Sequence, residues 1–147
     1  MSGYAGGGQT EGTVRLAGMS MKLLLLLSGG LEASGGAVSL IAPTLVIDVL
    51  FGVSADAVSV VLARFFGAGI LSFGLAAVLA CRHADSPAGL GVAYGVMCYN
   101  LIVALLLIWA VAAVELGGVI LWAAGIGHAL LGLLFLRAVI GYQIKGR

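Results

Sequence analysis

Residues 54–82 read SADAVSVVLARFFGAGILSFGLAAVLACR, and between Asp56 and Arg82 the only charged residue is Arg64. Every other residue between those two is apolar or small. At about 1.5 Å per residue, a helix of this length exceeds the hydrocarbon core of a bilayer, which is about 30 Å thick. The stretch therefore predicts a membrane-spanning helix that carries one arginine within the bilayer.

The composition of the whole chain agrees with this interpretation. Of the 147 residues, 62% are hydrophobic and 9% are charged, whereas about 25% of the residues of soluble domains are charged. This composition argues against a water-soluble globule, and the length allows one domain of about four spans. The net charge is +1, and no polybasic tail favours a nucleic-acid partner. The 24 glycines follow no G-X-Y repeat and indicate close helix packing.

Three further apolar runs predict the other spans, and a short helix follows the first of them. The four spans are expected over residues 22–42, 54–82, 88–114 and 119–140. Pro43 ends or kinks the first span because proline cannot continue the helical hydrogen bonds. The next stretch, which ends at Gly52, is too short to cross a membrane and predicts an interfacial helix. Ser54 is expected to cap the second span, with Asp56 in its first turn favouring the helix dipole.

The beginning of the chain allows two interpretations. Residues 1–20 are rich in glycine and polar side chains, which predicts a disordered tail ahead of a single four-helix domain over residues 21–147. Met21, Lys22 and the five leucines that follow also resemble a signal peptide. No A-x-A cleavage site closes a short apolar region, and apolar sequence resumes beyond Glu32. We therefore interpret this region as the first span.

The distribution of charge predicts the orientation in the membrane. With four spans, both termini and the turn at residues 82–87 lie on one side. Six of the seven basic residues fall at or near that side, and only Arg64 lies towards the other. Because cytoplasmic loops are enriched in lysine and arginine, both termini are expected in the cytoplasm. Lipid is expected to surround the protein.

Four polar side chains fall within the predicted spans: Glu32, Arg64, Asn100 and His128. A charge at bilayer depth costs at least about 2.5–3.5 kcal/mol, and lipid offers it no partner. We therefore expect these side chains to face one another inside the bundle. Glu32 would pair with Arg64 or His128, and the amide of the third span would complete the hydrogen bonds. Such a layer either fixes the helix register, or forms a site for a proton, an ion, a quinone head group or a small polar ligand, or faces an oligomer partner.

Small residues recur beside these polar ones and predict the faces on which the helices pack. Glycine lets two helix backbones approach closely. The glycines expected to do so are Gly29, Gly36, Gly67, Gly91, Gly95 and Gly132. Two of them, at positions 91 and 95, form a GxxxG pattern in the third span.

The sequence supplies no residue set for a familiar catalytic or metal chemistry. It contains no HExxH, Walker, GxSxG or CxxCH motif. A single histidine within the spans, with one or two carboxylates, falls short of a metal-ligand set. No catalytic residue and no metal site are therefore predicted, enzymatic activity is not favoured, and the cofactor is left open, with quinone and lipid as candidates.

Short motifs in all four spans form a wider pattern. In chain order they are Ala42-Pro43, Ala63-Arg64-Phe-Phe-Gly67, Gly74, Tyr99-Asn100, and Trp122 with His128. Over about residues 22–140 this pattern resembles the DoxX-like group of small bacterial membrane proteins. The resemblance implies an inner-membrane four-helix bundle and, as for some of these relatives, a role as a subunit beside a redox enzyme that reduces quinone.

Together these observations predict an all-α, four-span transmembrane bundle with a short interfacial helix between the first two spans. Two functions stay open. The first is an accessory or scaffold subunit in a homo-oligomer or a larger membrane complex. The alternative is a carrier or ligand-binding protein, for quinone, lipid or protons, that uses the four polar residues. A pocket touching Glu32 and His128 would favour the carrier, whereas glycine faces pressed on a neighbouring chain would favour the scaffold.

Overall fold

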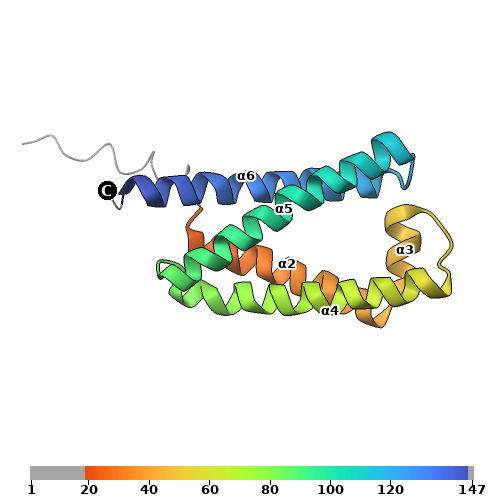
Figure 1. The fold of residues 1–147 in the computed structure, drawn as a ribbon, viewed down its shortest axis with the longest axis horizontal. Coiled ribbons are helices and arrows are strands. Elements are labelled where there is room, and N and C mark those ends of the chain that lie inside the picture. The colour runs from red at the N-terminus through yellow and green to blue at the C-terminus, as the bar shows by residue number, and fades with distance from the viewer. Residues whose placement is uncertain (1–18, 146–147) are drawn as a thin grey trace, which may run out of the picture.

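The computed structural model describes residues 19–145, and this part of the chain is helical (Figure 1). The elements are α2 (Met21–Ile41), α3 (Pro43–Phe51), α4 (Ala57–Ala80), the short 3-10 helix η1 (Cys81–His83), α5 (Pro87–Val114) and α6 (Val119–Lys145). In this part of the chain, α2, α4, α5 and α6 are long and apolar enough to cross a membrane. The predicted all-α fold with four spans is confirmed. The predicted disordered tail over residues 1–20 lies, except for its last two residues, outside the described residues.

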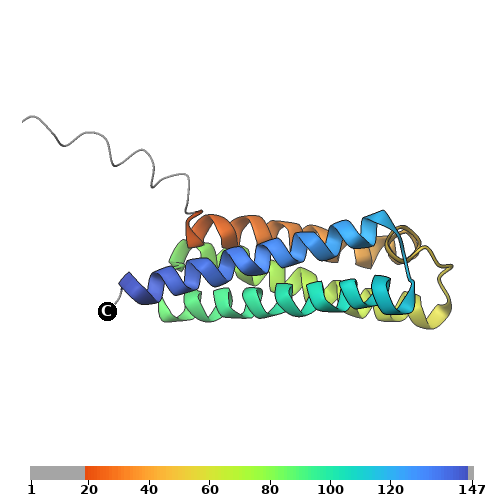
Figure 2. The ribbon, with the colours of Figure 1, turned by 90° about the horizontal axis from the view of Figure 1, so that it is seen from above.

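The four long helices lie along one common axis and alternate in direction (Figures 1 and 2). Both ends of the described chain and the turn around η1 lie at one end of the bundle, and α3 lies at the other (Figure 1). The axis of α3 runs across the bundle, so that this helix is seen end-on in Figure 2. An amphipathic helix at a membrane surface lies in the plane of the membrane, across the spanning helices. The orientation of α3 is the one expected of an interfacial helix.

The predicted breaks between helices are present. Pro43 begins α3 directly after α2, and the left-handed conformation of Gly52, with φ of 67°, ends it. Glycine adopts this conformation without a steric penalty, which makes it a common helix terminator. The fourth span is longer than predicted, because α6 continues past residue 140 to Lys145.

The predicted cap of the second span is wrong by two residues. Asp56, not Ser54, is the N-cap of α4. The carboxylate of Asp56 accepts a hydrogen bond from the Ser59 backbone N–H at 2.7 Å, and the Ser59 hydroxyl accepts one from the Asp56 backbone N–H at 2.9 Å. This reciprocal capping box satisfies two backbone donors. Ser54 has no equivalent partner three residues later, since Ala57 offers no polar side chain.

The most extensive contact between two helices joins α2 and α4, which run antiparallel. Gly29 and Gly36 on α2 meet Gly67 and Gly74 on α4. A Cβ atom added to Gly36 would lie 2.6 Å from the Gly67 carbonyl oxygen, and one added to Gly74 would lie 2.6 Å from the Gly29 carbonyl oxygen. Only glycine allows backbones this close. In each helix the two glycines are seven residues apart, and two turns of helix return them to the same face.

The remaining glycines predicted to pack differ in how closely they approach a neighbouring helix. A Cβ atom on Gly132 of α6 would lie 2.6 Å from the Leu101 side chain of α5. Gly95 allows an ordinary contact, with Phe73 at 3.7 Å. A Cβ atom at Gly91 would meet nothing within 4 Å in the described chain. The GxxxG pattern of α5 is therefore not a close helix contact within this chain.

Candidate functional site

Three of the four predicted polar residues lie together where α2, α5 and α6 meet. The His128 Nδ1 atom is 2.8 Å from Asn100 Oδ1 and 3.8 Å from Glu32 Oε1. Asn100 is fully buried, Glu32 is nearly so, and His128 is half-buried. The Glu32–His128 pairing was one of the two expected, and Asn100 completes it as predicted. We call these residues, together with Tyr99, the polar cluster.

Tyr99 and Phe73 extend the polar cluster to α4. The rings of Tyr99 and His128 meet edge to face with centroids 5.9 Å apart, and the Phe73 ring lies 5.3 Å from that of Tyr99. The Tyr99 side chain also lies near the Glu32 carboxyl group. Every long helix therefore contributes a side chain at this level. Sequence reasoning cited Tyr99 only as part of a motif, although a phenol beside Asn100 in an apolar span was a usable signal.

Arg64 does not join the polar cluster. Its side chain is exposed on α4, and it forms no ion pair or hydrogen bond with any residue that the structure describes. The reason is the register of α2 on α4, because Gly74 packs against the backbone of Ala33, the residue after Glu32. Gly74 is ten residues from Arg64, which is about 15 Å along the helix. The alternative pairing of Glu32 with Arg64 is not found.

Ser28 adds a further polar group on α2. It lies one turn before Glu32 on α2 and is fully buried. Its hydroxyl has no hydrogen-bond partner among the described residues. Buried hydroxyls are usually paired, so Ser28 is an exception beside the polar cluster.

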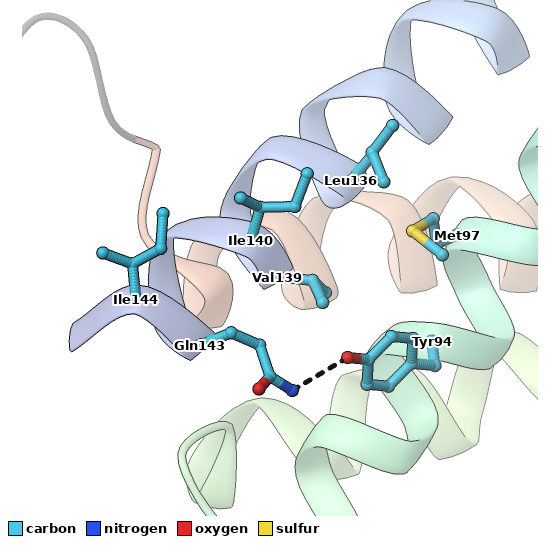
Figure 3. Close-up of a pocket in the computed structure, with 7 residues that line it drawn as sticks. All are labelled: Tyr94, Met97, Leu136, Val139, Ile140, Gln143 and Ile144. Atoms are coloured by element: carbon cyan, nitrogen blue, oxygen red, sulfur yellow. Dashed lines mark hydrogen bonds between the residues drawn. The ribbon is translucent and has the colours of Figure 1, made fainter. Parts of the chain in front are cut away.

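A pocket of about 330 Å³ lies nearer the termini, between α5 and α6 (Figure 3). It is lined by Tyr94, Met97, Leu136, Val139, Ile140, Gln143 and Ile144. The Gln143 side-chain amide donates a hydrogen bond to the Tyr94 hydroxyl at 3.1 Å across its mouth (Figure 3). This pocket does not touch Glu32 or His128. The glycine faces of α2 and α4, in turn, press on each other within the chain rather than on a neighbour.

The polar cluster has the parts of a proton- or ligand-binding site. A carboxyl group and an imidazole can each gain or lose a proton, and the amide and the phenol can orient a bound group by hydrogen bonds. Among the described residues, no group of three His, Cys, Asp or Glu side chains is arranged to hold a metal ion.

No family model, curated protein or solved structure matches this chain. The function is therefore inferred from the chemistry of the polar cluster.

Proposed function

We propose that this multi-pass membrane protein binds a proton or a small polar ligand inside the bilayer, at the polar cluster of Glu32, Tyr99, Asn100 and His128. One observation carries the proposal: Glu32 Oε1 approaches His128 Nδ1 to 3.8 Å although the two residues come from the first and last spans. Ionisable groups within spans are costly, and they mark proton relays and ligand pathways. Of the two predicted functions we therefore prefer the carrier or ligand-binding protein, on the contact of Glu32 with His128 and not on the pocket, which touches neither residue.

The arrangement suits a neutral or singly charged occupant. The Glu32 carboxyl group and the His128 imidazole can each take up a proton, so the pair can hold one between the first and last spans. Asn100 is held in place because its side-chain amide nitrogen donates to the Val96 carbonyl oxygen at 2.9 Å. A quinone head group or a lipid head group also offers oxygen atoms that such a site can bind.

The experiment compares the wild type with Glu32→Gln in two assays. Proteoliposomes with a trapped pH-sensitive dye report proton flux, and native mass analysis in mild detergent reports a retained ligand. We expect flux or a retained ligand in the wild type and its loss in Glu32→Gln. Glu115→Gln is the matched control, because Glu115 is exposed and lies after α5, outside the polar cluster. A wild type inactive in both assays, or a Glu32→Gln protein equal to it in both, refutes the proposal.

A second function, as an accessory subunit, is favoured by Arg64. This charge lies within α4, and the neighbouring Phe65 and Phe66 are 73% and 56% exposed. An acidic side chain of a neighbouring chain would compensate a cation placed on the outer surface of a span. The resemblance to DoxX-like proteins supports the same role.

Mass measurement of the complex in mild detergent tests this second function. Arg64→Gln should release a partner or a second copy, whereas Arg82→Gln, in the turn outside the spans, should not. A wild type that is monomeric and free of other proteins excludes it.

We further propose that the protein lies in the bacterial inner membrane with both termini in the cytoplasm. The excess of basic residues on the side of the termini supports this orientation.

A further inference from the structure

We infer that Asn100 holds the His128 ring in the tautomer that carries its hydrogen on Nδ1. The unprotonated Nε2 atom is then free to accept a hydrogen bond, so the ligand of the site is a hydrogen-bond donor, such as a neutral molecule with a hydroxyl group. This deepens the proposed function and rests on it. Asn100 is then a positioning residue, and a ligand that can only accept hydrogen bonds does not bind at Nε2 of His128.

The first step is the orientation of the Asn100 amide. Its Nδ2 atom donates to the Val96 carbonyl oxygen, one turn earlier on α5, at 2.9 Å. A flipped amide would place two oxygen atoms against each other at this distance, since a carbonyl oxygen cannot donate. The Asn100 oxygen Oδ1 is therefore the atom that faces His128.

The second step is the position of the hydrogen on the imidazole. His128 Nδ1 is 2.8 Å from Asn100 Oδ1, and a pair of heavy atoms this close needs one donor. Because the oxygen can only accept, Nδ1 carries the hydrogen. The Glu32 carboxyl group, whose Oε1 atom lies 3.8 Å from the same nitrogen, adds a second acceptor oxygen on this side of the ring and so favours the same arrangement.

The third step follows from the chemistry of a neutral imidazole. With one nitrogen protonated, the other has a lone pair and accepts. No described residue forms a hydrogen bond with Nε2 of His128. The His128 side chain is 22% exposed, so a bound group can reach the ring. The site thus presents an acceptor, which a hydroxyl group satisfies and a ketone or ether does not.

Nitrogen NMR of the histidine ring tests the tautomer directly. The chain has two histidines, so His83→Gln leaves His128 as the single ¹⁵N-histidine signal in nanodiscs at neutral pH. We expect a protonated Nδ1 and an unprotonated Nε2. A ring protonated at Nε2 would overturn the inference, whatever the proton-flux and ligand assays show.

Two variants in the His83→Gln background test the role of Asn100. Asn100→Leu removes the acceptor, and we expect the Nε2–H form to appear. Asn100→Asp keeps an acceptor oxygen beside Nδ1 if its second oxygen carries a hydrogen and donates to the Val96 carbonyl oxygen. We expect Nδ1 to stay protonated in this variant, which also guards against a misfolded leucine variant. If His128 stays wholly Nδ1–H in a folded Asn100→Leu protein, Glu32 sets the tautomer and the role assigned to Asn100 is refuted.

A matched pair of probes tests the ligand class. A 4-alkylphenol has a hydroxyl donor, and its methyl ether has the same shape without one. We expect the phenol to shift the Nε2 resonance of His128 and the ether to leave it unchanged. Equal shifts from both probes, or none from either, would overturn the assignment of a donor ligand, while proton uptake by the wild type would still uphold the proposed function.

Discussion

At the scale of single residues, Glu32 shows how side chains of the bundle take the place of water around a buried ionisable group. The residue is 6% exposed, and its carboxyl group lies near His128 of the last span and Tyr99 of the third. A buried ionisable side chain is tolerated when partners from the protein take the place of its hydration. The side chains that lower this cost are the same ones to which the proposed function assigns proton or ligand binding.

Ser28→Ala should raise stability. The Ser28 hydroxyl is buried without a hydrogen-bond partner in the described chain, and leaving a buried polar group unpaired costs about 1–3 kcal/mol. The matched control is Ser39→Ala, because the Ser39 hydroxyl donates to the Gly35 carbonyl oxygen at 2.9 Å. Unfolding in a denaturing detergent should show a gain for the first variant and no gain for the second. Equal effects of the two substitutions would contradict the contrast in hydrogen bonding.

The stability of the first turn of α4 should depend on pH through Asp56. The hydrogen bond from the Ser59 backbone N–H lowers the pKa of the Asp56 carboxyl below its ordinary value of 3.8. Because the folded pKa is the lower one, the capping stabilisation is complete above the ordinary value and is lost as the pH falls through the folded value. Amide hydrogen exchange over the first turn of α4 should show protection at neutral pH that falls in this acidic range.

Asp56→Asn is the control for this pH dependence. Asparagine caps helices as well as aspartate does but does not titrate. Its first turn should keep the same protection across the acidic range. A wild type that responds to acid no more than this variant would show that the carboxylate is not the cause.

At the scale of elements, the pairing of α2 with α4 determines the register of the bundle. Gly36→Ala should be destabilising, because the new Cβ atom would meet the Gly67 carbonyl oxygen at 2.6 Å and force the helices apart. Overpacking of this kind costs about 1–3 kcal/mol. Thermal unfolding in detergent should show a lower midpoint.

Gly35→Ala is the matched control, one residue away in the same helix. A Cβ atom at Gly35 meets nothing within 4 Å. Alanine is a better helix former than glycine by up to about 1 kcal/mol, so this variant should be as stable as the wild type or more so. If the two alanine variants unfold alike, the close contact of α2 and α4 is not as described.

At the scale of the whole molecule, two helix pairs are joined at the polar cluster. The pairs α2–α4 and α5–α6 have the most extensive contacts, and the contacts between the pairs are fewer. Glu32 belongs to the first pair, whereas Asn100 and His128 belong to the second. Polar contacts between helices hold membrane bundles together where apolar packing gives no preference over lipid. The polar cluster therefore joins the two helix pairs, in addition to being the candidate functional site.

Cysteine labelling tests the proposed orientation of the whole molecule. In a background with Cys81→Ala and Cys98→Ala, Asp85→Cys lies in the turn at the end of the bundle where α2 begins and α6 ends. Gly118→Cys lies between α5 and α6 at the opposite end. An impermeant maleimide added to intact cells should label the second position and not the first. Labelling of the first position alone would invert the proposed orientation.

The amino-acid sequence by itself determined the number of spans and the main helix breaks. Span number depends on hydrophobic length against bilayer thickness, and the breaks depend on the local backbone chemistry of Pro43 and Gly52. The N-cap of α4 also depends on local sequence, but Ser54 and Asp56 are both acceptable N-cap residues. Only the capping box that Asp56 forms with Ser59 distinguishes them.

The tertiary structure alone decided the partners of the polar residues. Glu32 had two candidate partners, and the backbone contact between Gly74 and Ala33 placed Arg64 about 15 Å away along α4, out of reach. The seven-residue spacing of glycines in both helices was present in the sequence. The pairs of glycines that contact each other depend on the relative axial position of the two helices. Helical periodicity fixes a residue's face and depth within its own span, whereas the level at which two spans meet is an outcome of their packing.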